Sequence, residues 1–433
     1  MKFVVQPGGA LKGDIRVPGD KSMSHRSVML GALADGITQV QGFLEGEDAL
    51  ATVAAFRAMG VRIDGPTGGR LSIHGVGLNG LSAPEHPLDM GNSGTSMRLL
   101  SGLLAGQGFN TELIGDASLM KRPMSRVITP LEKMGASISS APDGRPPLHI
   151  LGGQPLRGIH YDLPIASAQV KSCVLLAGLM ASGRTSVTEP APTRDHTERM
   201  LRGFGYAVEE ANGVISVEGG GSLEAADIDI PADISSAAFF LIGASIAPGS
   251  DLLLRHVGMN PTRTGVLSIL DLMGANIEII NPREVGGEPV ADLRVRYAPL
   301  KGIQIPEEFV PLAIDEFPAL FIAAACAEGA TILTGAEELR VKESDRIASM
   351  ARGLDALGII NLPTPDGIRI EGGSMGSATI ETFDDHRIAM SFSMAALRAK
   401  GPITVLNCDH VATSFPGFAD LASGVGLQLD TDS

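Results

Sequence analysis

The sequence of 433 residues has only three cysteines, at positions 173, 326 and 408. They are too few and too scattered for a disulfide framework, and Cys173 and Cys326 lie in apolar runs typical of small buried side chains. No apolar run reaches the roughly 18 residues that a membrane-spanning helix needs. The N-terminus has neither a signal peptide nor an Arg- and Ser-rich transit segment. The sequence therefore predicts a cytoplasmic, soluble protein.

Basic residues are also scarce. The chain has 34 Lys and Arg against 49 Asp and Glu, so its formal net charge is −15. An acidic surface repels nucleic-acid phosphates and anionic membranes, so neither is expected as a partner. An anionic ligand would need a local basic site built against this field, which makes clustered Lys and Arg the residues to look for.

Glycine and proline, by contrast, are abundant. The 54 Gly and 27 Pro residues form no Gly- or Pro-rich tract, so turns are spread evenly between many short elements. A chain of this length suggests two or three domains at roughly 100–200 residues each.

A short pattern recurs along the chain: an apolar residue, two variable residues, an apolar residue, then glycine. Each glycine has the position of a helix C-cap, and an alternating apolar stretch typical of a strand usually follows it. The glycines lie 68 to 84 residues apart, at Gly60, Gly135, Gly205, Gly274, Gly358 and Gly426.

A second series runs out of phase with the first. Six segments are apolar around most of their circumference, which predicts buried helices. They cover 24–35, 95–106, 168–181, 234–247, 316–328 and 386–399, and each is followed by a glycine. The unit is then about 72 residues, and six units in an α/β protein fill the chain. Three units in each of two domains is the natural packing, with the break near 231–233.

The predicted buried helices begin with polar residues. Ser, Thr, Asn and Asp there are ordinary N-caps. Lys21, Arg26 and Arg387 are harder to explain, because a cation at a helix N-terminus opposes the helix dipole. Free N–H groups and nearby cations together make an anion site. The residues alone thus predict a two-domain enzyme whose helix ends face one cleft and bind small substrates carrying phosphate and carboxylate groups.

Motifs for nucleotide binding, zinc binding and nucleophilic catalysis are either incomplete or absent. The run 75–80, GVGLNG, matches a dinucleotide fingerprint, but two prolines follow it where a helix is required. The run 18–22, PGDKS, resembles the end of a phosphate-binding P-loop, but Asp20 breaks the motif. No Cys/His set has zinc spacing, and no nucleophile elbow occurs.

Six motifs in order resemble the 5-enolpyruvylshikimate-3-phosphate (EPSP) synthase family over essentially the whole chain. They are 18–26 (PGDKSMSHR), 91–98 (GNSGTSMR), 116–123 (DASLMKRP), 167–171 (SAQVK), 340–346 (RVKESDR) and 385–387 (DHR). The related UDP-N-acetylglucosamine enolpyruvyl transferases carry a catalytic Cys in the loop before Arg-Pro, and 116–123 has none. A non-catalytic anion-binding homologue is the remaining alternative.

The resemblance implies a two-domain inside-out α/β barrel of six βαβαββ units. It places units one to three in 20–233, units four to six in 1–19 with 234–433, and the active site in the cleft between them. It further implies that phosphoenolpyruvate donates its enolpyruvyl group to the 5-hydroxyl of shikimate 3-phosphate, with release of phosphate. This step of the shikimate pathway leads to chorismate and the aromatic amino acids. No metal or cofactor is implied, and a monomer is expected.

The resemblance also assigns roles to individual residues. The catalytic set is Asp315 as base on the 5-hydroxyl, Glu343 as carrier of the methylene proton, Lys21 and His386. The contacts to shikimate 3-phosphate are Lys21, Ser22, Arg26, Ser167, Ala168, Gln169, Arg194, Asp315 and Lys342. The contacts to phosphoenolpyruvate are Lys21, Gly94, Thr95, Arg122, Gln169, Arg346 and Arg387. Family members also bind the inhibitor glyphosate in the phosphoenolpyruvate pocket.

Two positions depart from the family pattern, and two assignments have structural alternatives. Ala168 stands where many members have Ser, and Thr413 stands where many have Lys. Asp315 could be only an N-cap, and Glu343 could be only half of an ion pair with Lys342 or Arg346.

Overall fold

The computed structural model describes residues 1–432, which form two compact units. One unit contains Gly19–Ile230, and the other contains Met1–Pro18 with Pro231–Ser433. Each unit has its own hydrophobic core. The chain passes between the units twice, and the two passages lie side by side because Asp233 N donates to Pro18 O at 2.9 Å. The expected boundaries at 19/20 and 233/234 fall within a few residues of these passages.

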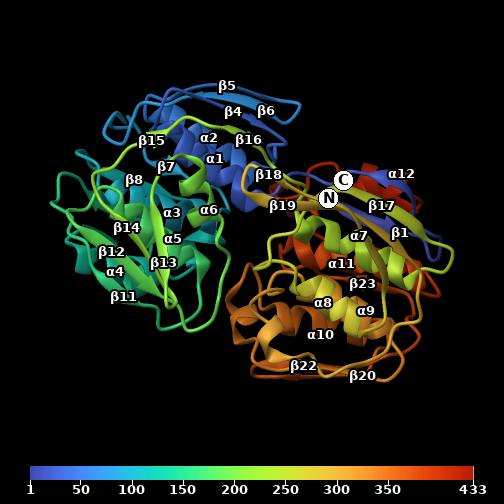
Figure 1. Ribbon diagram of the computed structural model, residues 1–433. Coiled ribbons are helices and arrows are strands. Elements are labelled where there is room, and N and C mark those ends of the chain that lie inside the picture. The colour runs from blue at the N-terminus through green and yellow to red at the C-terminus, as the bar shows by residue number, and fades with distance from the viewer. Residues whose placement is uncertain (433) are drawn as a thin grey trace. The chain divides into compact units, whose positions relative to one another are not determined.

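Six buried helices form the centres of the two units, three in each (Figure 1). They are α1 (Lys21–Leu33), α3 (Gly94–Ala105), α5 (Ala168–Gly178), α7 (Ile234–Ile246), α9 (Phe317–Cys326) and α11 (His386–Ala395). Every residue of α7 is buried, and α1 is exposed to solvent only at its first turn. The prediction of six buried helices is confirmed; their starts differ from the predicted ones by at most three residues, and each helix ends one to four residues earlier than predicted.

Six further helices alternate with the buried ones. They are α2 (Glu47–Ala58), α4 (Ser125–Met134), α6 (His196–Gly203), α8 (Gly265–Leu272), α10 (Arg346–Ala356) and α12 (Phe418–Gly424). The predicted glycine follows each of these helices within two residues, and all six glycines have positive φ angles between 77° and 116°. Glycine adopts this conformation without steric cost, so the predicted C-caps are confirmed.

Sheets with one repeated topology surround the helices of the Gly19–Ile230 unit. The strand order of the first sheet is β16 (Asp227–Asp229), β4 (Ile37–Gln41), β6 (Arg70–His74), β5 (Arg62–Thr67). The order of the second is β7 (Leu88–Asp89), β8 (Thr111–Ile114), β10 (Arg145–Leu151), β9 (Ser137–Ala141). The order of the third is β11 (His160–Asp162), β12 (Arg184–Thr188), β14 (Val214–Glu218), β13 (Val208–Ala211). The first pair of strands in each sheet is parallel and the others are antiparallel. A short ribbon of β15 (Leu223–Glu224) and β3 (Ala34–Asp35) completes this unit.

The second unit repeats this topology. Its strand orders are β2 (Lys12–Ile15), β17 (Asp251–Gly258), β19 (Glu288–Arg296), β18 (Asn276–Val285); β20 (Ala330–Leu333), β22 (Gly367–Glu371), β21 (Asn361–Thr364); and β23 (Ala378–Ile380), β24 (Ile403–Val405), β1 (Lys2–Val5), β25 (Leu429–Asp432). In the three-stranded sheet a single parallel bridge between Gln304 and Ile332 takes the place of the first strand. The six predicted repeats are therefore present.

Two repeats exchange their first strands. The N-terminal strand β2 pairs in parallel with β17 of the fourth repeat, while β16, at the end of the third repeat, pairs in parallel with β4 of the first. The strand β1 completes the sheet of the sixth repeat, and the blue N-terminal strand is seen beside the C-terminal elements in Figure 1. This exchange is why the chain must pass between the units twice.

Candidate functional site

The N-terminal turns of α1, α3 and α5 lie in hydrogen-bond contact with one another. His25 Nδ1 in α1 is 3.2 Å from Ser96 Oγ in α3. Arg26 of α1 donates to Ser172 of α5, and Gln169 Nε2 at the start of α5 donates to Thr95 Oγ1 of α3 at 2.9 Å. The unit Gly19–Ile230 therefore brings the positive ends of three helix dipoles together, as an anion site requires.

Lys21 begins α1, which is capped by the side chain of Asp20 through the N–H of Met23. The Lys21 ammonium is paired with the buried carboxylate of Asp48, which lies in the first turn of α2. The pair holds the ammonium at the helix end, where the dipole alone would repel it. Ser22 follows, half-buried, so Lys21 and Ser22 are both accessible to a ligand.

Gly94 lies at the first turn of α3, beneath two guanidinium groups. A Cβ atom added at Gly94 would lie 3.2 Å from Arg122 Nη1 and 3.4 Å from Arg98 Nη1. Arg122 Nη2 donates to Asn92 Oδ1 at 2.6 Å, which fixes the guanidinium over the helix end. Because Gly94 has no side chain, Arg122 can lie close to the start of the helix, where the guanidinium and the helix N–H groups together favour an anion.

Ser167, Ala168 and Gln169 start α5, and all three are half-buried. Ser167 is the N-cap, and its hydroxyl accepts from Val170 N. Because Ala168 has no hydroxyl, this position offers a ligand only its backbone. Gln169 accepts from Arg98 Nη1 and donates to Thr95, so its amide is oriented from both sides.

Arg26 is almost completely buried and is hydrogen-bonded within its own unit. It is 3% exposed. Its guanidinium donates to Thr197 Oγ1 at 2.7 Å, to Ser172 Oγ at 2.9 Å and to Ser22 O at 3.0 Å. The structure therefore places Arg26 under the helix ends, where it supports Ser22, and its contact with substrate stays a prediction.

In the second unit, the buried guanidinium of Arg346 joins three carboxylates. Arg346 Nε donates to Asp385 Oδ2 at 2.9 Å, Nη1 to Asp315 Oδ1 at 3.2 Å, and Nη2 to Glu343 Oε2 at 2.6 Å. Arg346 is 1% exposed and Asp385 is fully buried, whereas Asp315 and Glu343 are partly exposed. The three neighbouring carboxylates raise the pKa of Arg346 even though burial alone would lower it.

Asp315 is not the N-cap of α9. The cap residue is Glu316, and its side chain makes no capping hydrogen bond. The Asp315 carboxylate instead lies between Arg346 and Arg387, whose Nη2 is 4.0 Å from Asp315 Oδ2. The capping alternative for Asp315 is therefore wrong. Glu343 does form an ion pair, and its partner is Arg346. The other partner considered, Lys342, instead lies 3.7 Å from Glu338.

The remaining predicted residues of this unit lie at the start of α11. Asp385 caps the helix by accepting from Arg387 N at 2.9 Å, and it also accepts from Ser344 Oγ. His386 is buried and Arg387 is half-buried. Thr413 is buried, and its hydroxyl donates to His410 O at 2.7 Å, so it is directed into the fold rather than replacing the missing Lys.

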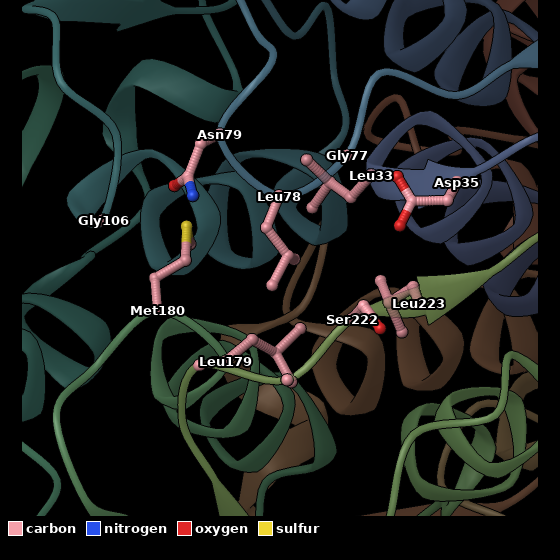
Figure 2. A pocket seen from close by; sticks show the side chains of 12 residues that line it. Leu33, Asp35, Gly77, Leu78, Asn79, Gly106, Leu179, Met180, Ser222 and Leu223 are labelled. Atoms are coloured by element: carbon pink, nitrogen blue, oxygen red, sulfur yellow. The ribbon is translucent and has the colours of Figure 1, made fainter.

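A hollow of about 290 Å³ opens at the opposite ends of α1, α3 and α5 (Figure 2). Leu78, Leu179 and Leu223 surround it, and Asp35 is its one charged residue. Three helix C-termini and a carboxylate make this end electronegative. The hollow therefore does not suit a phosphate or carboxylate ligand, and no predicted site residue lines it.

Residues 1–432 contain neither a membrane-spanning helix nor a cluster of metal ligands. No helix in this part of the chain is long and apolar enough to cross a membrane. No group of three or more His, Cys, Asp or Glu in the same residues is arranged to hold a metal ion.

Residues 5–421 match the family model described as EPSP synthase (3-phosphoshikimate 1-carboxyvinyltransferase). The chain belongs to the EPSP synthase family. The resemblance inferred from the six motifs is confirmed.

Curated relatives agree with this family. A 3-phosphoshikimate 1-carboxyvinyltransferase of Methylococcus capsulatus is 68% identical over 99% of this chain and 98% of its own. The enzyme of the same name from Alkalilimnicola ehrlichii is 67% identical over 99% and 96%. The solved structure of EPSP synthase from Acinetobacter baumannii superposes with a TM-score of 0.90 at 59% identity, covering both chains completely.

A more distant structure shares the fold. The enolpyruvyl transferase NikO from Streptomyces tendae has a TM-score of 0.77 at 18% identity, over 99% of this chain and 98% of its own. The fold is thus the two-domain inside-out α/β barrel that the family resemblance implied.

Sequence reasoning missed some residues that support the site. Asp48 pairs with Lys21, Asn92 holds Arg122, and Asp385 joins Arg346 to the start of α11. Asn92 and Asp385 lie inside motifs of the EPSP synthase family, so their position was a usable signal. Asp48 lies outside the motifs in an ordinary helix start, and its sequence context carries no such signal.

Proposed function

We propose that this protein transfers the enolpyruvyl group of phosphoenolpyruvate to the 5-hydroxyl of shikimate 3-phosphate, releasing phosphate, as a step of the shikimate pathway toward chorismate and the aromatic amino acids. We further propose that the helix ends of both units form one active site in the cleft between them. The observation that carries the proposal is the cluster of Arg346 with Asp315 and Glu343.

The reaction needs both an acid and a base. A proton must reach the methylene carbon of phosphoenolpyruvate, so that its neighbouring carbon becomes electrophilic and the 5-hydroxyl oxygen can attack it. Asp315 would accept the hydroxyl proton, and Glu343 would deliver the methylene proton and take one back when the C–O bond to phosphate breaks. One guanidinium holds both carboxylates, so the two proton transfers can occur at neighbouring positions of one bound pair of substrates.

The exposure of Glu343 supports its role in proton transfer. Asp315, Glu343 and Asp385 carry three formal negative charges, and Arg346 and Arg387 carry two positive ones. Glu343 is the most exposed of the three carboxylates, so a ligand can reach it. His386 and Lys21 are proposed as further catalytic groups.

The anionic groups of the substrates would be bound by helix ends and cations. Lys21, Gly94, Thr95, Arg122, Gln169, Arg346 and Arg387 would contact phosphoenolpyruvate. Ser22, Arg26, Ser167, Ala168, Gln169, Arg194 and Lys342 would contact shikimate 3-phosphate, together with Lys21 and Asp315. Of the five N–H donors of Arg346, four already point at carboxylates, which leaves one on Nη1 for a ligand. One chain supplies all of these residues, so we propose that the monomer is the active unit.

Phosphate release in the presence of both substrates tests the proposal, together with calorimetric titration of each substrate. Asp315→Asn and Glu343→Gln should bind shikimate 3-phosphate but lose about 10²–10⁴-fold in kcat, the usual contribution of positioned proton transfer. Glu371→Gln, on the exposed face of β22, is the matched control and should keep full activity. Binding of both substrates to the wild type without phosphate release would instead identify a non-catalytic homologue.

A further inference from the structure

Lys171 is a buried cation that the proposed reaction does not use. It lies in the first turn of α5, two residues after Gln169, and its side chain is 1% exposed. Its Nζ is 2.8 Å from Glu189 Oε2 and 2.8 Å from Glu198 Oε1. The two carboxylates raise the pKa of Lys171 although burial opposes this, so the group stays charged.

The partners of Lys171 lie at the two ends of one connecting segment. Glu189 follows the last residue of β12, and Glu198 is in the first turn of α6. Between them the segment 189–195 (EPAPTRD) has no helix or strand, and Pro190 and Pro192 have no N–H group with which to anchor it. Lys171 Nζ also donates to Thr193 O at 3.4 Å, and the Thr193 hydroxyl donates to Glu189. One ammonium therefore holds both ends and the middle of the segment.

The next residue after Thr193 is Arg194. Glu198 is 1% exposed, and burial raises the pKa of its carboxyl even though Lys171 opposes this. The α6 end of the segment is tied further, because Thr197 Oγ1 accepts from Arg26 and is 2.7 Å from Ser172 Oγ. Arg26 thus links the carbonyl of Ser22 to Ser172 in α5 and to Thr197 in α6. Lys171, next to Ser172 in α5, donates in turn to the carbonyl of Thr193, which precedes Arg194.

We propose that Lys171 is a positioning residue that holds segment 189–195 against the start of α5, and so places the guanidinium of Arg194 for the phosphate of shikimate 3-phosphate. This inference rests on the proposed function, in which Arg194 contacts that phosphate. The Lys171 ammonium has three N–H donors, and Glu189, Glu198 and Thr193 O already lie within reach of them, so none is left for the substrate.

The test compares KM values for the two substrates in a double-mutant cycle. Because Lys171→Met alone leaves two buried carboxylates without a partner, Lys171→Met is combined with Glu198→Gln. Arg194→Ala should raise the KM for shikimate 3-phosphate about 10-fold or more, since a charge-assisted hydrogen bond is lost. Lys171→Met/Glu198→Gln should raise it to a similar extent while changing the KM for phosphoenolpyruvate less than about twofold.

Non-additivity distinguishes positioning from general damage to the fold. In the Arg194→Ala background, Lys171→Met/Glu198→Gln should change the KM for shikimate 3-phosphate less than about twofold, because there is no guanidinium left to misplace. Hydrogen exchange at the amides of Thr193, Arg194 and Asp195 should become at least about tenfold faster in Lys171→Met/Glu198→Gln. Lys133→Met, an exposed lysine of α4, is the control and should change none of these values.

The outcomes distinguish the role of Lys171 from the role of Arg194 and from the proposed reaction. Multiplicative effects of the two changes, or unchanged exchange in segment 189–195, would overturn the role of Lys171 while leaving Arg194 as a contact. An unchanged KM for shikimate 3-phosphate in Arg194→Ala would show that Arg194 does not contact this substrate, which overturns the inference. An active wild type would still support the proposed reaction. A wild type that releases no phosphate would overturn the proposed function itself.

Discussion

Individual cationic side chains near the helix starts are held in place by neighbouring residues without being fully covered. Lys21 is held by Asp48 and Arg122 by Asn92, yet Lys21, Arg122 and Thr95 all remain half-buried rather than fully covered. Arg346, by contrast, is buried among three carboxylates, and its hydrogen bonds fix the positions of Asp315 and Glu343. Small changes at such positions should therefore alter ligand binding selectively.

Gly94 gives the first prediction. Gly94→Ala places a methyl group 3.2 Å from Arg122 Nη1, so that the guanidinium must shift by a few tenths of an ångström. The family resemblance places the phosphonate of glyphosate beside this Cα, and glyphosate reaches further than phosphoenolpyruvate. The inhibition constant of glyphosate should rise by a larger factor than the KM for phosphoenolpyruvate.

Inhibition kinetics at several phosphoenolpyruvate concentrations measure both values. Gly108→Ala, where an added Cβ has nothing within 4 Å, is the control and should leave both unchanged. Equal inhibition constants for the wild type and Gly94→Ala would refute the steric argument.

His25 gives a prediction about pH. Burial, and then the nearby charges of Lys21 and Arg26, hold the pKa of His25 well below its usual value of 6.5. Between the two pKa values the unfolded chain binds a proton that the folded protein does not. Stability contributed by neutral His25 is therefore fully present above about pH 7.5 and falls as the pH drops below 6.5, by up to about 1.4 kcal/mol per pH unit.

The melting temperature at pH 7.5 and at pH 5.5 tests this. The difference between the two temperatures should be smaller in His25→Asn than in the wild type, because Asn does not titrate. The exposed His86→Asn should keep the wild-type difference. The same difference in all three proteins would show that His25 does not control the pH dependence.

At the scale of elements, glycine allows the chain to change direction at the ends of the six alternating helices. The glycine after each of the alternating helices has a positive φ angle, and each of the six helices reaches its following strand through it. The end of α6 has glycines of both kinds, because Gly203 is inside the helix and Gly205 has φ +77°. These two positions lie two residues apart and permit a matched comparison.

Gly205→Ala should lower stability by about 1–2 kcal/mol, the cost of a left-handed conformation for a residue with a Cβ. Gly203→Ala should raise stability by about 0.5–1 kcal/mol, because alanine loses less backbone entropy in a helix. An added Cβ meets nothing within 4 Å at Gly203 and only ordinary contacts at Gly205, so the difference reports backbone conformation. Chemical denaturation of the two variants measures it, and equal shifts of the same sign would contradict the prediction.

At the scale of the whole molecule, the proposed active site needs residues from both units. Lys21, Gly94, Arg122 and Gln169 belong to Gly19–Ile230, whereas Asp315, Glu343 and Arg387 belong to the other unit. The first set offers cations and a helix start, and the second offers Arg387, so a multiply charged anion stabilises any arrangement in which it contacts both.

Shikimate 3-phosphate should therefore make the protein more compact. Small-angle scattering should show a smaller radius of gyration at saturating shikimate 3-phosphate than without ligand. Inorganic phosphate at the same concentration is the control, because it lacks the carboxylate and hydroxyl groups of shikimate 3-phosphate, and it should leave the profile unchanged. An unchanged profile with shikimate 3-phosphate, at a concentration shown by calorimetry to saturate the protein, would refute the prediction.

The helices and their ends could be predicted from the sequence because they depend on residues that are neighbours along the chain. Apolar runs of helical length predicted the six buried helices, and glycines at fixed offsets predicted where the alternating helices end. The motif residues at the starts of α1, α3, α5 and α11 were found in the same way, since a polar cap before an apolar run is a local signal.

Pairings between distant segments were decided only by the tertiary structure. The strands β2 and β16 have four and three residues, and nothing in so short a run says that β2 joins β17 and β16 joins β4 rather than the reverse. The residues 315, 343 and 385 likewise meet at Arg346 only because α9, α10 and α11 pack together. A parallel pair is held by backbone hydrogen bonds that any residue except proline can make, so the partner is chosen by which sheet edge the rest of the fold leaves open.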